Sequence, residues 1–201
     1  MAIVIKKTLK AEDTPVKKIM EESGLEIDLS NKDRLFLVKK MYKQAKTAEP
    51  DQDSLEEEMK QYLLQLPTGF DLATMQESHK LFALINSFIG RIVEIEAVAN
   101  GNKSRWERLM KLMKAYLDER GSEILLSEEC MDLPNAKLQD AFVRKELKKH
   151  YAYLATFTDK VGKASAFFEN VIGKRKYLNS TYQSLSRQVS TLESELRSLN
   201  G

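Results

Sequence analysis

The most regular pattern of apolar residues lies in the last third of the chain. From Val143 to Leu199, apolar side chains recur in alternating steps of four and three residues, and only His150 and Arg175 interrupt this series of seventeen positions. A period of 3.5 residues predicts one long helix that supercoils with partner helices. Two ordinary helices that break near Gly173 are the alternative.

A second helical pattern occupies the middle of the chain. Apolar residues from Leu81 to Ala99 again follow steps of four and three, and a neighbouring stripe widens this surface. So wide an apolar face predicts more than one partner helix. We expect Asn100-Gly101-Asn102 to interrupt or kink this helix, which resumes near Trp106 and stops at Gly121.

The connection that follows, residues 121–133, has no helical periodicity and is predicted to be irregular. Pro134 then suits the first turn of the next helix, because its missing N–H costs nothing at that position.

Shorter helices are expected before residue 70. Thr14-Pro15 and Gly24 are start and stop signals for one of them, and residues 30–48 carry the spacing of a second. Asp53 is expected to cap a third, acidic helix that ends at Pro67-Thr68-Gly69. Residues 1–9 fit either a short strand or an arm without fixed structure.

Together these patterns predict an all-α fold, a helical hairpin or bundle with a long C-terminal coiled-coil helix. Residues 1–70 are expected to form accessory helices, 71–133 core helices with a basic segment, and 134–201 the long helix with its coiled-coil tail. Only eight Gly and four Pro occur in 201 residues, too few for a sandwich or barrel that turns every ten residues or so.

The length of the last helix predicts self-association. The segments within 71–120 can cover it to about residue 180, which leaves its end without a partner in the same chain. Because each buried leucine contributes about 1.5–3 kcal/mol, exposure of that end would be costly. We therefore expect a homo-oligomer held by Leu178, Tyr182, Leu185, Val189, Leu192, Leu196 and Leu199.

Enzyme chemistry is hard to find in this sequence. One Cys and two His exclude a disulfide framework and most zinc sites, and no Gly-rich phosphate loop occurs. Glu146 and His150 are four residues apart, not the three of ferritin-like di-metal helices. Acidic neighbours disfavour the thiolate of Cys130. We expect neither catalysis nor a metal or cofactor.

No apolar run approaches the length of a membrane-spanning helix, and the opening MAIVIKK is too short for a signal-peptide core. We therefore expect a soluble protein of the cytoplasm with no membrane partner.

Clusters of basic residues are the remaining functional signal. The net charge is only +2, so an electrostatic role must come from local clustering. A row of cations flanks Trp106 and Tyr116, rings that either stack on bases or belong to the core, and a second group follows Gly173. The candidate nucleic-acid-binding residues are Lys103, Arg105, Arg108, Lys111, Lys114, Lys174, Arg175 and Lys176. The alternative is a solvated helix face.

KLMKAYLDERG (111–121) and FVRKELKKHYAYLATFTDKVGKASAFFENVIGKRKYLNSTYQSL (142–185) resemble phage recombination mediators of the UvsY type. The resemblance covers about residues 100–185. It implies a ring-like oligomer that binds single-stranded DNA, reorganises the single-strand-binding protein and loads a RecA-like recombinase, without cofactor or catalysis. Lys111 matches a DNA-contacting position of that family. A second basic position falls on Met113, and Lys114 is the nearest substitute.

Two functions therefore remain open at this point. The first is an oligomeric accessory protein for single-stranded DNA, and the second is a structural coiled-coil protein for assembly, scaffolding or adaptor roles of the phage type. In the second reading the basic residues only solubilise the helices.

Overall fold

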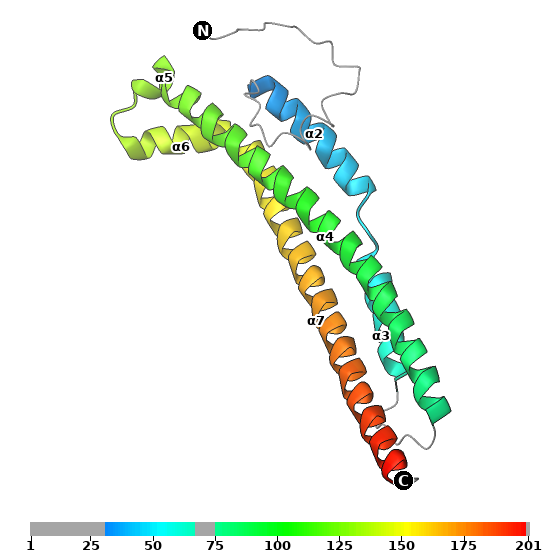
Figure 1. Cartoon of the computed structure of the whole chain (residues 1–201). Coiled ribbons are helices and arrows are strands. Elements are labelled where there is room, and N and C mark those ends of the chain that lie inside the picture. Colours follow the sequence, from blue (N-terminus) through cyan, green and yellow to red (C-terminus); the bar gives the residue numbers. More distant parts are fainter. Residues whose placement is uncertain (1–30, 67–74, 200–201) are drawn as a thin grey trace, which may run out of the picture. The chain divides into compact units, whose positions relative to one another are not determined.

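The computed structural model describes residues 31–66 and 75–199, which belong to one compact unit that begins at Asn31 (Figure 1). In these ranges every element is a helix, so the predicted all-α fold with a long C-terminal helix is confirmed. The helices are α2 (Asn31–Thr47), α3 (Gln52–Leu64), α4 (Met75–Leu125), α5 (Glu128–Met131), α6 (Ala136–Glu146) and α7 (Lys148–Leu199). The segment 1–9, the helix predicted after Thr14 and the stop signal at Pro67 lie outside the described residues.

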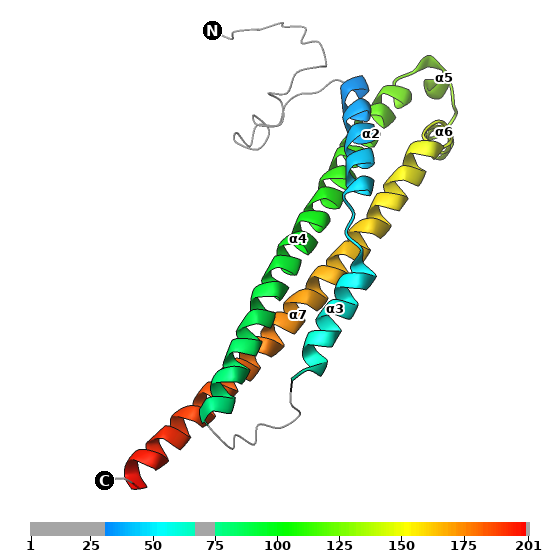
Figure 2. The same cartoon turned by 90° about the vertical axis from the view of Figure 1, so that its right-hand side faces the viewer.

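The two long helices α4 and α7 form an antiparallel hairpin (Figures 1 and 2). Ring contacts between Phe82 and Tyr182 near one end, and between Tyr116 and His150 near the other, fix their register. At 1.5 Å per residue each helix is about 75 Å long. The short helices α2 and α3 follow one another along this hairpin (Figure 2).

Both long helices keep a heptad seam. On α7 the residues Phe157, Ala164, Val171, Leu178 and Leu185 stand seven apart, and each is at most 1% exposed. On α4 the same spacing and burial hold for Ile85, Ile92, Ala99, Trp106 and Met113. The 3.5-residue period thus places one continuous apolar edge of each helix against the other.

The predicted interruption at Asn100-Gly101-Asn102 is wrong, because α4 is helical throughout these residues. Asn102 lies on the buried seam between Ala99 and Trp106. The helix also continues past Gly121, where a side chain would stand 3.6 Å from Val143 Cγ1. A helical Gly costs about 1 kcal/mol. The free energy gained by burying the apolar seam residues before and after each glycine outweighs that cost.

The connection between the long helices is more ordered than predicted. Helix α4 extends to Leu125, and α5 forms a further helical turn within the segment expected to be irregular. The Asn135 side chain caps α6 by accepting the Leu138 N–H at 3.0 Å, so Pro134 precedes the cap and does not lie in the first turn.

The long C-terminal helix begins later than predicted. Helix α6 ends at Glu146 and Leu147 is its C-cap, so α7 starts at Lys148 and not at Val143. Helix α7 then runs without a break past Gly173, which rules out the alternative of two separate helices.

Two apolar cores follow one another along the hairpin. The α2 core combines α2, the second half of α4, α6 and the first half of α7, and it includes Val38, Trp106, Met113, Val143 and Phe157. The α3 core combines α3, the first half of α4 and the second half of α7, and it includes Met59, Ile92, Val171, Leu178 and Leu185. Asp51 caps α3 by accepting the Ser54 N–H at 3.2 Å, so the cap is not Asp53 as predicted.

The premise of the predicted self-association is wrong for most of the tail. Because α4 is unbroken, it covers α7 well beyond residue 180, and Leu178, Leu185 and Val189 are buried in the α3 core. Tyr182 packs against Phe82 in the same chain. Leu192 is half-buried, Leu196 is exposed, and the Leu199 side chain lies outside the described residues.

Candidate nucleic-acid interface

The predicted basic row on α4 divides into two kinds of residue. Arg108, Lys111 and Lys114 are exposed. Lys103 and Arg105 instead make contacts within the fold: Lys103 Nζ lies 5.1 Å from the centre of the Phe168 ring, and Arg105 Nη1 donates to the Ala48 carbonyl at 2.9 Å. The three exposed cations step by three residues, so they spread over about 120° of the helix surface.

The second predicted group does not extend this row. Arg175 pairs with Glu96 of α4 at 2.8 Å, whereas Lys176 is exposed. Lys174 lines a shallow groove with Leu63, Asn170, Gly173 and Tyr177. Lys111 lies fifteen residues beyond Glu96 on α4, or about 22 Å, so the structure keeps the two groups apart.

The aromatic residues of the predicted interface belong to the core. Trp106 is 1% exposed and Tyr116 is 6% exposed. Trp106 packs near Tyr42 and Phe157, with ring centres 6.2 Å apart in each pair. Neither ring is available for stacking on a base. The alternative that both rings belong to the core is therefore correct.

A stronger basic surface lies on α2, and the sequence analysis missed it. This helix has six basic residues and one acidic residue, a local charge of +5. We call the exposed part of this surface the lysine face, and it consists of Lys32, Phe36, Lys39, Lys40, Lys43 and Lys46. At 100° per residue these positions fall within a sector of about 120°. The signal was present in the sequence, since Lys fills five of the ten polar positions of this helix.

The first turns of α7 bring further cations beside the lysine face. Tyr153, which is 46% exposed, has its ring centre 6.3 Å from that of Tyr42 on α2. Burial lowers the pKa of His150, and the nearby cations Lys39, Arg120 and Lys149 lower it further. Positive charge from α2, α4 and α7 therefore converges at this point.

A small cavity opens at the same place. It has a volume of about 90 Å³ and lies between α2, α4 and α7. The lining residues are Leu35, Val38, Lys39, Tyr42, Met113, His150, Tyr153 and Phe157. Its walls are mainly apolar and aromatic, and His150 Nδ1 is buried without a hydrogen-bond partner in the described part of the chain. Cations beside aromatic rings are the combination that single-stranded nucleic acids bind.

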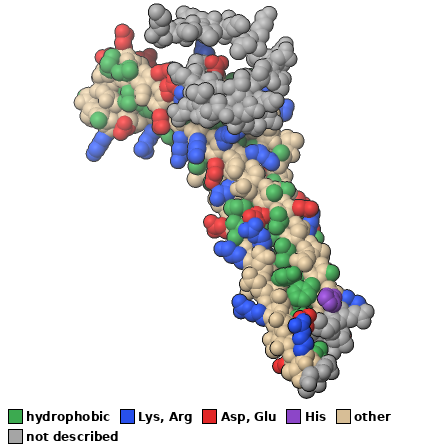
Figure 3. Space-filling view, viewed as in Figure 1, with side chains coloured by type: hydrophobic (Ala, Val, Ile, Leu, Met, Phe, Trp, Pro, Cys, Tyr) green, Lys and Arg blue, Asp and Glu red, His purple; other side chains and the backbone are tan. Residues whose placement is uncertain are grey.

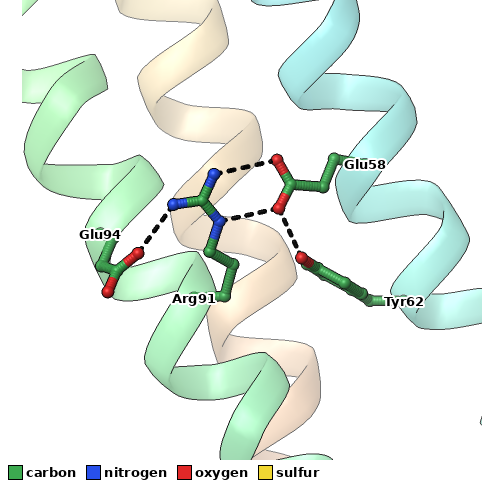
Figure 4. Close-up of polar contacts among 4 residues, drawn as sticks. All are labelled: Glu58, Tyr62, Arg91 and Glu94. Carbon is green, nitrogen blue, oxygen red and sulfur yellow. Dashed lines mark hydrogen bonds and ion pairs between the residues drawn. The ribbon is translucent and has the colours of Figure 1, made fainter.

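The charges of α3 serve a different purpose, shown in Figure 4. Arg91 Nε and Nη2 donate to the two Glu58 oxygens at 2.7 and 3.2 Å, and Nη1 donates to Glu94 at 2.7 Å. The Tyr62 hydroxyl also donates to Glu58. The hydrogen bonds from Arg91, and then from Tyr62, hold the pKa of Glu58 below its usual value, and the bond to Glu58 raises the pKa of Tyr62. This network joins α3 to α4.

The remaining candidate chemistry is limited. Among residues 31–66 and 75–199, no three His, Cys, Asp or Glu side chains are grouped as metal ligands. Cys130 is buried, with Sγ 3.9 Å from the Gln139 carbonyl oxygen. None of the helices in this part of the chain has the length and apolarity needed to cross a membrane.

Comparison with known proteins adds no relative: no family model matches the chain, and neither curated proteins nor solved structures give a match. The resemblance to UvsY-type mediators therefore stays a prediction.

Proposed function

We propose that this protein is a helical accessory protein that binds single-stranded DNA through the lysine face of α2 and the adjoining first turns of α7. The observation that supports this proposal is the lysine face itself: five exposed lysines and one exposed phenylalanine on a single side of one helix. The interface expected on α4 is not part of this proposal.

Charge in this chain is strongly segregated. Residues 31–47 carry +5, and residues 141–153, with four basic residues against Glu146, carry +3, whereas the whole chain carries only +2. The rest of the chain is therefore acidic. Because salt screens charges beyond about 8–10 Å, a phosphate on the lysine face would respond to the nearby lysines and hardly to distant carboxylates.

Within the described residues, the lysine side chains of this face take part in no ion pair or hydrogen bond. Arg34 pairs with Glu119 of α4 at 3.1 Å, and α2 is otherwise held by buried side chains such as Val38 and Ala45. Lys32, Lys39, Lys40, Lys43 and Lys46 point into solvent and repel one another. A polyanion would remove this repulsion and gain the release of its own counterions.

Exposed rings favour a single strand over a duplex. Phe36 is 60% exposed in the middle of the lysine face, and Tyr151 and Tyr153 are exposed on α7. Unpaired bases stack on such rings for about 1–3 kcal/mol each, whereas paired bases are hidden inside the duplex. The proposed roles in reorganising a single-strand-binding protein and loading a RecA-like recombinase rest on the family resemblance alone.

The test is fluorescence anisotropy of a labelled oligo-dT, titrated with protein at about 50 and about 200 mM salt. The lysine-face variant carries Gln at Lys40, Lys43 and Lys46. The matched control carries Gln at Arg108, Lys111 and Lys114, which are equally exposed on α4. We expect the lysine-face variant to lose at least about tenfold in affinity at low salt and to depend less on salt.

The control variant should bind within about twofold of the parent protein, as expected for cations outside the contact surface. A larger loss in the control than in the lysine-face variant would move the interface to α4. Absence of binding by the parent protein at low salt would refute the proposed function and leave the structural coiled-coil alternative.

A further inference from the structure

The end of the hairpin that carries α5 and α6 exposes large apolar side chains. Leu126 is 75% exposed and Met131 is 56% exposed, and Leu125 and Leu138 are also exposed beside them. Figure 3 shows apolar and acidic side chains together at this end. We call this surface the acidic tip, because residues 122–140 contain five acidic residues and only one basic residue, Lys137, for a local charge of −4.

The fold explains only part of this composition. Cys130, between Leu126 and Met131 in the sequence, is fully buried in the α2 core. The exposed apolar residues around Cys130 are not buried in either core. Exposed apolar surface of this kind usually marks an interaction site. The acidic side chains Glu128, Glu129 and Asp132 are exposed beside these apolar groups.

The lysine face has the complementary design. Phe36 is an exposed apolar group among lysines, whereas Leu126 is an exposed apolar group among carboxylates. Within one chain the two surfaces do not cover each other, since both side chains remain more than half exposed. Matching apolar centres with opposite charges around them gives both attraction and specificity.

We propose that the acidic tip of one molecule docks on the lysine face of a second copy. Each copy offers one tip and one face, so the contact is heterologous and either closes into a ring or continues along a filament. The homo-oligomer predicted from the sequence would then form, but through this surface and not through the tail of α7. If the proposed function holds, DNA and the tip compete for the same lysines.

The test is complementation between two variants, measured by sedimentation velocity. The tip variant carries Leu126→Lys and Met131→Lys, and the face variant carries Phe36→Glu and Lys40→Glu. All four positions are exposed, so both variants should fold, which circular dichroism verifies. Val93→Lys, at an exposed apolar position of α4, is the matched control.

We expect the parent protein and the control to associate across the micromolar range, and each variant alone to stay monomeric. An equimolar mixture of the two variants should form a heterodimer and nothing larger, because the intact tip of one docks on the intact face of the other. A monomeric parent protein, a mixture that stays monomeric, or variants that associate like the parent would each overturn the proposal.

The proposed function is tested separately, since the tip variant keeps an intact lysine face and should bind oligo-dT at least as tightly as the parent protein. Oligo-dT should also dissociate the parent assembly, and an assembly that persists with DNA bound would refute the competition. Failure of every form to bind DNA would refute the proposed function and the competition, while the complementation result would still decide the docking.

Discussion

Helices α2 and α3 occupy equivalent positions, one after the other along the same hairpin, yet their charges are opposite. Helix α2 carries +5, whereas α3, with four acidic residues against Lys60, carries −3. The charges of α3 are partly used in packing, as in the contact of Glu58 with Arg91 and of Glu56 with Asn170. The five exposed lysines of α2 have no such use in the described structure. The hairpin therefore packs against a positively charged and a negatively charged short helix alike, and packing among residues 31–66 and 75–199 does not account for the charge of α2.

The largest expected effect tests whether the two cores are independent. Leu178 is fully buried in the α3 core, and Leu178→Ala should cost about 2–5 kcal/mol of unfolding free energy. Since α4 and α7 run through both cores, we expect the α2 core to unfold with it. Trp106 is the only tryptophan, so urea unfolding followed by its fluorescence reports the α2 core. If the urea midpoint of Trp106 fluorescence stays the same while the midpoint of the far-UV circular dichroism signal shifts, the two cores unfold as separate units.

The next prediction compares how α2 and α3 are attached. Tyr42 of α2 lies among Trp106, Tyr153 and Phe157, with ring centres 5.5–6.3 Å away, and Tyr42→Ala should cost about 2–3 kcal/mol. Arg91→Ala removes the exposed ion pair with Glu58 and should cost no more than about 1 kcal/mol. Only the loss of stability caused by Arg91→Ala should become smaller in high salt, because salt screens the ion pair. Thermal denaturation measures both losses. Equal costs would mean that α3 depends on its charges as much as α2 depends on its rings.

A smaller effect is expected at the boundary between the two cores. Asn102 is 1% exposed, and its side-chain amide has no hydrogen-bond partner within residues 31–66 and 75–199. Asn102→Leu should therefore raise the unfolding free energy by about 1–2 kcal/mol, because an uncompensated polar group leaves the interior. The measurement is urea denaturation, with Asn100→Leu at an exposed position as control. A loss of stability in Asn102→Leu would contradict this account.

The smallest effect concerns pH. His150 faces Lys39 of α2, Arg120 and the Tyr116 ring of α4, and Lys149 on its own helix, and its pKa in the folded state lies below the ordinary 6.5. The unfolded chain therefore binds a proton more readily, so this contribution to stability is present above pH 6.5 and is lost as pH falls below it.

His150→Gln should reduce the fall in melting temperature between about pH 7.5 and about pH 5.5, a window above the ordinary carboxylate range. We expect a difference of about 2 °C. His79→Gln, at an exposed position of α4, serves as the control. If the melting temperatures of the parent protein and His150→Gln depend on pH in the same way, His150 is not the source of the loss of stability at low pH.

The heptad seams could be predicted from the sequence because burial depends on spacing, which the sequence displays. The break at Asn100-Gly101-Asn102 was predicted wrongly, because local helix propensity was given more weight than a seam that continues on both sides. The partner of the seam could not be predicted, since Leu185 looks the same whether α4 or a second chain covers it.

The candidate interface was predicted less well than the fold. Trp106 was left open as a stacking ring, although the seven-residue spacing already places it on the apolar seam of α4 with Ala99 and Met113, so its burial could have been predicted. The rings near the lysine face could not be grouped from the sequence, because Tyr42 of α2 and Tyr153 of α7 are far apart in it, and their ring centres come within 6.3 Å only in the folded chain.

The antiparallel register of α4 and α7 also determines how this protein would respond to mechanical force. Tension that separates the two helices at the end near Phe82 and Tyr182 would open one layer of side chains at a time, so a modest force would suffice. Tension along the hairpin axis would instead strain every layer from that end to Tyr116 and His150 at once. The hairpin should consequently resist tension along its axis more strongly than tension that peels its helices apart.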